Sequence, residues 1–167
     1  IGADFESWLG ESFYFDKTER VINELKSKNL LTLDDGAYIV KLDDYGMNPC
    51  LILKSDGSTI YATRDIAAAI YRKETYNFDK CIYVTSAGQS LHFAQFFKVI
   101  DLMGYEWAKD LVHVPFGTVS IAGAKLSTRD GNIVLLEDLF KDAISKTLEI
   151  INEKNPDLED KENVAKA

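Results

Sequence analysis

The segment from residue 80 to residue 117 constrains the fold more than any other part of the sequence. It holds two short apolar runs, "KCIYVTS" and "LVHVPFG", which are typical of buried strands. Between them, "LHFAQFFKVIDLM" has apolar residues at helical spacing, and Gly104 follows as a predicted C-terminal stop. These apolar residues are Phe93, Phe96, Phe97, Ile100 and Met103. A strand, a helix and a strand within about thirty residues predict a βαβ unit, and therefore a parallel sheet.

The residues before this unit predict two helices with a hairpin region between them. "DKTERVINELKSK", residues 16–28, has helical apolar spacing with Asp16 as its expected N-cap. "AYIVKL" and "CLILK" are strand-like, and the Asp-Gly pair in "LILKSDGSTIYAT" predicts a β-hairpin. Thr59 or Thr63 is then expected to cap the Ala-rich helix "RDIAAAIYRKE".

The two ends of the chain differ in character. Residues 136–153 predict an amphipathic helix that ends before Pro156, and the polar tail beyond it is expected to fray. At the other end, the chain opens on "IGADFESWLG" without an initiator Met. We therefore expect this sequence to be a piece of a larger protein.

Composition limits the classes of function. The chain has 167 residues, a formal net charge of −8 and 46% hydrophobic residues, which fits one globular domain with or without an appendage. A pI near 4.8 argues against this piece holding nucleic acid alone, because phosphate neutralisation needs a basic surface. No apolar run approaches the roughly 20 residues of a membrane span. Cys50 and Cys81 lack metal-ligand spacing and are expected to be reduced, buried thiols of a cytoplasmic protein.

The loop "AGAKLSTRDGN", residues 122–132, is basic and rich in hydroxyl groups. Lys125 and Arg129 supply two cations, and Ser127 and Thr128 lie between them. Ligands of open parallel sheets bind beyond the carboxyl ends of the strands, where this loop and the turn "TSAGQS" are both expected. Two cations with hydroxyl and amide donors suit a polyphosphate. Considered alone, "KLSTR" fits a solvated hairpin tip better than a phosphate site, and it is not a Walker loop.

Several motifs resemble one enzyme family. "KLSTRDG" resembles the KMSKS signature of class I aminoacyl-tRNA synthetases, and more closely the K-M-S-T-R-x-G form of arginyl-tRNA synthetases. "YATRDIAAAIYR", "SAGQSLHFAQFF", "HVPFG", "SWLGESFY" and "LDDGAYIV" also resemble segments of that family, in the same order. The sequence departs from the family pattern in three ways. Leu126 replaces Met, Thr128 replaces the second Lys of the general signature, and an H-I-G-H motif is absent.

The resemblance implies an α/β fold with a Rossmann-like parallel sheet, the C-terminal half of a class I catalytic core, and a small hairpin-containing insertion. Residues 1–58 would be the insertion or connecting segment, and residues 59–135 the second half of the core. Residues 136–167 would be a helix leading to a further C-terminal domain. The full-length protein would use ATP to convert arginine to arginyl-adenylate and would charge tRNA(Arg). The piece alone is expected to be inactive.

The resemblance also assigns roles to individual residues. Tyr61, Asp65 and Gln89 would bind arginine, because a guanidinium group favours a carboxylate and an aromatic face. The catalytic loop residues that hold the phosphates would be Lys125, Ser127 and Thr128. The ATP site would comprise Gly88, His92, Val114, Phe116, Gly117, Lys125 and Arg129. Mg²⁺ would arrive with ATP, without a dedicated protein metal site.

Other interpretations of these residues remain open. Asp65 is also suited to the first turn of a helix, where the helix dipole favours an acid, and Tyr61 to the core. Gln89 is equally a surface residue at a helix start, His92 is equally a core histidine, and His113 is expected to be structural. For the whole chain, the alternatives are a noncatalytic interaction module that retains the fold, or a different adenylate-forming α/β enzyme.

Overall fold

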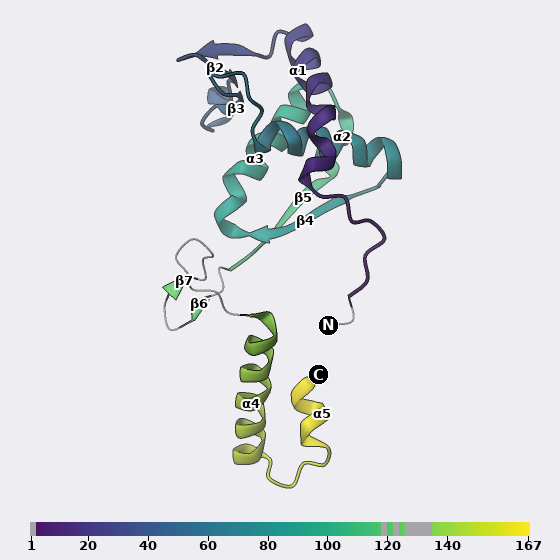
Figure 1. Cartoon of the computed structure of the whole chain (residues 1–167), viewed down its shortest axis with the longest axis vertical. Coiled ribbons are helices and arrows are strands. Elements are labelled where there is room, and N and C mark those ends of the chain that lie inside the picture. The colour runs from purple at the N-terminus through teal and green to yellow at the C-terminus, as the bar shows by residue number, and fades with distance from the viewer. Residues whose placement is uncertain (1–2, 118–119, 122–123, 126–134) are drawn as a thin grey trace. The chain divides into compact units, whose positions relative to one another are not determined.

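The computed structural model describes residues 3–117, 120–121, 124–125 and 135–167. The chain is a mixture of helices and strands, most of which Figure 1 labels, and it divides into two compact units. Unit 1 is residues 1–117 and contains the predicted βαβ segment. Unit 2 is residues 118–167 and contains the C-terminal helices.

The first helix of unit 1 is α1, Thr18–Ser27, and its inner face buries Val21 and Leu25. The expectation that Asp16 caps this helix is wrong. A 3-10 helix, η1, runs from Glu11 to Lys17 directly into α1, and no side chain caps the junction. Asp16 is therefore inside a helical turn, where the backbone lacks the extended conformation that an N-cap requires.

An antiparallel sheet follows, with strands β1 (Thr32–Asp34), β2 (Ala37–Val40) and β3 (Cys50–Leu53) in the order β1-β2-β3. The short 3-10 helix η2, Asp43–Tyr45, lies between β2 and β3. The hairpin expected after β3 is reduced to a turn and one isolated bridge, between Leu53 and Thr59. The chain then enters the next helix at once, so no second strand forms.

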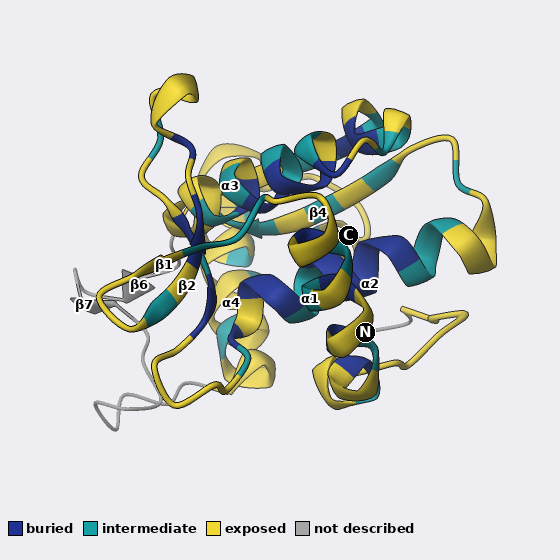
Figure 2. Ribbon diagram, turned by 90° about the horizontal axis from the view of Figure 1, so that it is seen from above, coloured by how far each residue is buried: buried dark blue, intermediate teal, exposed yellow. Residues whose placement is uncertain are grey.

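Helix α2, Tyr61–Tyr76, packs its Ala-rich face into the core of unit 1 (Figure 2). Neither Thr59 nor Thr63 caps it, contrary to expectation, since the N-cap position is Ile60 and no side-chain hydrogen bond is made there. The Thr63 hydroxyl is fully buried and instead donates to the carbonyl oxygen of Ile52 at 2.5 Å. This bond fixes the first turn of α2 against β3.

The predicted βαβ unit is confirmed. Strands β4 (Cys81–Ser86) and β5 (Leu111–Phe116) pair in parallel, with helix α3 (Ser90–Leu102) between them. The 3-10 helices η3 (Ala87–Gln89) and η4 (Glu106–Asp110) complete the connections. Gly104 follows α3 with φ +87°, so the predicted glycine stop is also confirmed.

The burial expected for these two strands is found on only one face. Tyr83 on β4 packs against Phe93 and Phe96 of α3, and Phe96 is fully buried. On the other face Val112 is half-buried, and four apolar side chains are between 44% and 64% exposed, namely Ile82, Val84, Val114 and Phe116. Parallel strands are normally covered on both faces. Within the described part of unit 1, one face of this sheet is therefore apolar and largely uncovered.

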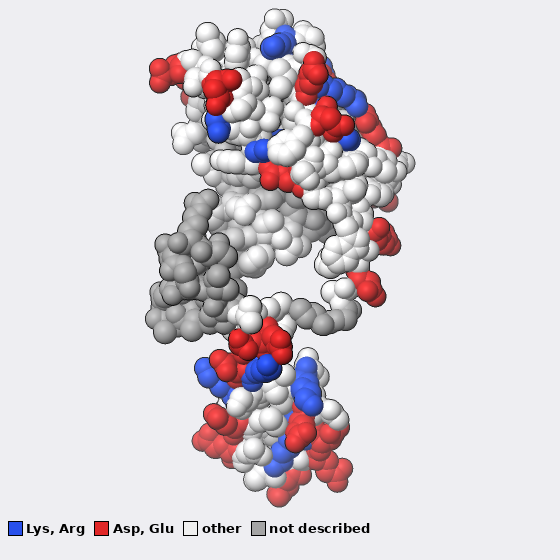
Figure 3. All heavy atoms as spheres, viewed as in Figure 1, with Lys and Arg blue, Asp and Glu red and all other residues white. Residues whose placement is uncertain are grey.

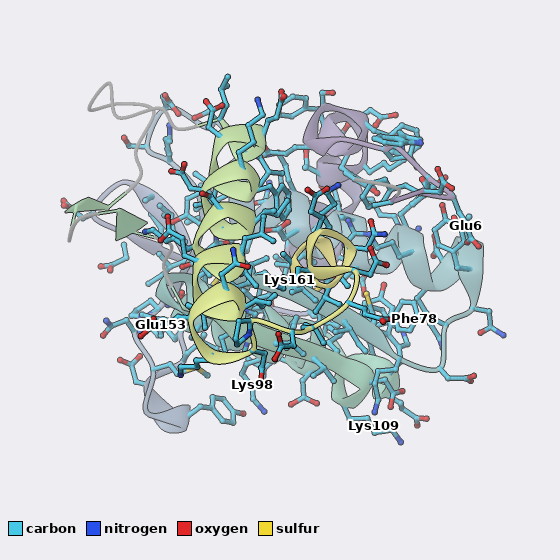
Figure 4. All side chains as sticks on the ribbon, turned by 90° about the horizontal axis from the view of Figure 1, so that it is seen from below. Glu6, Phe78, Lys98, Lys109, Glu153 and Lys161 are labelled. Atoms are coloured by element: carbon cyan, nitrogen blue, oxygen red, sulfur yellow. The ribbon has the colours of Figure 1, made fainter. Side chains whose placement is uncertain are left out.

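Unit 2 contains helix α4, Leu136–Lys154, which ends before Pro156 as predicted. The tail does not simply fray, because helix α5, Lys161–Lys166, forms beside α4 (Figures 1 and 4). The Lys161 ammonium donates to the side-chain oxygen of Asn152 and to the carbonyl oxygen of Pro156, which holds the start of α5 in place. Acidic and basic side chains are interspersed over these helices (Figure 3). Neither helix has a fully buried residue.

Strands β6 (Ser120–Ile121) and β7 (Ala124–Lys125) form a short antiparallel pair.

Candidate functional site

A pocket of about 390 Å³ lies in unit 1, where α2 and α3 both begin. Its lining residues are Tyr61, Asp65, Gly88, Gln89 and His92. The first two come from α2, and the others come from η3 and the first turn of α3. The packing of these helix starts thus brings together all three residues predicted to bind arginine.

Tyr61 and Asp65 lie one turn apart on α2, as the spacing predicts. Tyr61 is the first residue of the helix and is 59% exposed, so the alternative that it is a core residue is wrong. The first turn of α2 contains no acidic residue, because Asp65 lies beyond it. The interpretation of Asp65 as a first-turn acid is therefore wrong as well.

Among the described residues, Asp65 is the only carboxylate that lines this pocket, and no described Lys or Arg lines it. The adjacent Arg64 is engaged elsewhere. Its Nε lies 2.8 Å from Oε1 of Glu11, although without the alignment of a hydrogen bond, and its guanidinium lies over the ring of Phe15. The charge of Asp65 is thus not neutralised by its cationic neighbour, and the pocket favours a cationic ligand.

The turn after β4 positions Gly88 and Gln89. The Ser86 hydroxyl accepts a hydrogen bond from the backbone N–H of Gly88 at 3.3 Å, and the Ser90 hydroxyl donates to the carbonyl oxygen of Ala87 at 2.8 Å. Gln89 is exposed, and its amide makes no hydrogen bond to the described residues. The sequence interpretation assigned no role to Ser86, although a Ser two residues before a Gly is a recognisable turn signal.

His92 lies against the predicted arginine-binding acid. Its Nε2 is 2.7 Å from Oδ2 of Asp65, and its ring packs edge-on against Tyr61 with the centroids 4.9 Å apart. The resemblance places His92 towards the ATP ribose, and the alternative places it in the core. The structure gives it a specific polar partner, which sequence reasoning did not identify because 27 residues separate the two in the chain.

The end of β5 lies beside this turn, because Phe116 pairs with Ser86 in the sheet register. Val114, Phe116 and Gly117, which are predicted to lie along ATP, are all exposed at this end. His113 behaves as a structural residue: its Nε2 lies 2.9 Å from the Thr85 hydroxyl and its ring stacks on Phe93.

The predicted phosphate loop is only partly described. The backbone of Lys125 belongs to β7 and pairs with Ser120. Ser127, Thr128 and Arg129 lie outside the described residues. In the described ranges, no group of three or more His, Cys, Asp or Glu residues is arranged to hold a metal ion. None of the described helices is long and apolar enough to cross a membrane.

Comparison with known proteins assigns the family. The profile of "tRNA synthetases class I (R), catalytic domain" matches residues 3–167. The chain belongs to this family. This synthetase chain is 61% identical over 166 residues to the arginine–tRNA ligase of Clostridium perfringens, and 60% identical to that of Clostridium beijerinckii. Each alignment covers 99% of this chain but only 29% and 30% of the relative, respectively. The synthetase chain thus spans less than a third of the length of these curated relatives.

Solved structures agree with the family. The arginyl-tRNA synthetase of Plasmodium falciparum matches with a TM-score of 0.69 and 27% identity, over 96% of this synthetase chain and 27% of that protein. The Thermus thermophilus arginyl-tRNA synthetase has the same fold, with a TM-score of 0.66, 20% identity and coverage of 92% and 32%. With the parallel β4–β5 pair, these matches confirm the predicted Rossmann-like class I fold.

Proposed function

We propose that the full-length protein is an arginine–tRNA ligase, which activates arginine with ATP and transfers it to tRNA(Arg). Family membership and the high identity to arginine–tRNA ligases support this proposal. The observation that carries the choice of amino acid is the pocket itself. It offers one carboxylate that its neighbouring cation does not neutralise, an exposed aromatic ring and an exposed amide.

Arginine recognition follows from the chemistry of these three groups. The guanidinium carries a fixed positive charge and five N–H donors, and Asp65 supplies both the opposite charge and acceptor oxygens. The exposed ring of Tyr61 offers a surface on which a planar cation can pack. The amide of Gln89 both donates and accepts, so it can pair with the guanidinium or with the polar end of the amino acid.

Activation requires ATP beside this pocket. We place the adenine and ribose along Gly88 and the exposed end of β5, at Val114, Phe116 and Gly117. The phosphates would be held by the cations and hydroxyls of the loop that contains Lys125, with Mg²⁺ entering on ATP and neutralising part of their charge. The arginine carboxylate attacks the α-phosphorus, arginyl-adenylate forms and pyrophosphate leaves. The protein contributes position and charge stabilisation, without a covalent enzyme intermediate.

We also propose a role for each segment of the chain. Residues 59–135 would form the second half of the catalytic core, residues 1–58 an insertion, and residues 136–167 the helix leading to a further domain. A cytoplasmic location, where tRNA is charged, fits this role. The isolated chain is not expected to charge tRNA, because it spans about 30% of the relatives.

The test is arginine-dependent exchange of pyrophosphate into ATP by the full-length protein, with and without tRNA(Arg). Exchange that requires arginine, and that lysine or citrulline does not support, would establish the activity. A noncatalytic interaction module would show no exchange with any amino acid. A different adenylate-forming enzyme would exchange with another carboxylic acid in place of arginine.

A further inference from the structure

His92 and Asp65 are the two described lining residues of the pocket that a short hydrogen bond joins. Its Nε2 lies 2.7 Å from Oδ2 of Asp65, and the two side chains are 17% and 38% exposed, respectively. We propose that His92 is a positioning residue, which orients the carboxylate of Asp65 towards the guanidinium of arginine. This inference rests on the proposed function, and it assigns to His92 a contact with the amino-acid pocket in place of ATP.

The direction of this hydrogen bond follows from the partners. An ionised carboxylate can only accept, so Nε2 of His92 must carry the proton and donate. In the neutral imidazole this is the Nε2–H tautomer, with Nδ1 as the unprotonated nitrogen. A neutral donor leaves the negative charge of Asp65 in place. The carboxylate is thus oriented and still available to a cation.

The His92 ring is itself held in place. It packs against Phe93 and Phe96 of its own helix, α3, with centroid separations of 5.4 Å and 5.2 Å. It also packs against Tyr61 of α2. Phe96 is fully buried and Phe93 nearly so. The core of unit 1 therefore fixes the imidazole, and the imidazole in turn fixes the carboxylate.

Orientation matters because Asp65 is half-exposed. Without a partner, its side chain would sample several χ1 rotamers, and the carboxylate would turn partly to solvent. His92 engages Oδ2, and Oδ1 makes no hydrogen bond to any described residue. One oxygen thus stays open to an incoming N–H donor. A charged site that is already oriented loses less conformational freedom when its ligand binds.

Steady-state kinetics of the full-length protein can test this role. His92→Phe keeps a planar ring and removes the donor, and we expect the KM for arginine to rise on the order of tenfold, the effect of losing one hydrogen bond to a charged group. The KM for ATP should not change. His92→Gln, whose amide nitrogen reaches to the position of Nε2, should restore most of the arginine affinity.

His113, the other histidine of this chain, provides a matched control. His113→Phe removes a comparable hydrogen bond, to Thr85, without touching Asp65, and should leave the KM for arginine unchanged. In the background of Asp65→Asn, His92→Phe should have no further effect on arginine binding. His92→Phe could lower the Tm of the protein. In that case His92→Asn is compared with His92→Gln instead, because the shorter amide of Asn does not reach Asp65.

The outcomes separate this inference from the proposed function. If Asp65→Asn raises the KM for arginine but His92→Phe does not, the positioning role is refuted and the arginine site stands. If His92→Gln is as impaired as His92→Phe, the donor is not what matters, and the positioning role is again refuted. If Asp65→Asn has no effect on arginine, the arginine site itself is refuted.

Discussion

Replacing Asp65 by Asn removes one negative charge from the pocket and keeps the size of the side chain. Exposed ion pairs contribute about 0.2–1 kcal/mol, and losing one partner of a desolvated pair costs about 2–5 kcal/mol. Asp65 is 38% exposed in its side chain, which places it between these limits. We therefore expect a loss of about 1–3 kcal/mol of arginine binding, which corresponds to a rise in KM of about 5- to 150-fold.

The assay is pyrophosphate exchange by the full-length protein, with arginine varied at saturating ATP and then ATP varied at saturating arginine. A loss of uniform binding raises KM for arginine and leaves kcat nearly unchanged. Asp101→Asn is the control, because Asp101 lies on α3, is paired with Lys98 and does not line the pocket. Equal increases of both KM values in Asp65→Asn would refute the reasoning, since they would show that Asp65 supports the fold and does not bind the guanidinium.

Three further predictions test other parts of the chain. Thr63→Val should lower the free energy of unfolding by about 1–3 kcal/mol, measured by urea unfolding, because it leaves a buried carbonyl without its partner. Lys125→Ala should reduce kcat for adenylate formation by about 10²–10³ in pre-steady-state kinetics, with a smaller change in KM for ATP and a smaller effect for Ser127→Ala. Burial raises the pKa of the Cys50 thiol to about 12, so alkylation near pH 8 should modify Cys81 alone in the folded protein and both thiols in denaturant, as counted by mass spectrometry.

Local patterns predicted the elements of this fold well, because each depends on residues close together in the chain. The change from a strand-like run to helical spacing and back identified β4, α3 and β5, and Gly104 marked the end of α3. The caps were predicted wrongly because they depend on neighbouring structure. Asp16 is inside η1, and the hydroxyl of Thr63 bonds to a strand that precedes it by 11 residues.

The pocket was predicted in part for the same physical reason. Tyr61 and Asp65 share one helix, so their spacing alone places them on one face. Gln89 joins them only because the starts of α2 and α3 pack together, and it was found through its motif. The bond between His92 and Asp65 has no local signature, because either residue alone is typical of many helices. Only the packing of α2 against α3 shows that they are partners.

The apolar sequence pattern of β4 and β5 predicts cover on both faces of the sheet, whereas the structure shows cover on one face only. The runs "KCIYVTS" and "LVHVPFG" are apolar at nearly every position, which is typical of strands covered on both faces. In this chain α3 covers one face, while Ile82, Val84, Val114 and Phe116 remain exposed on the other. Arginine–tRNA ligases that match it are more than three times as long, since it covers 29–30% of them. We therefore expect polypeptide outside unit 1 to cover this face, since exposed apolar side chains gathered on one sheet are costly in water.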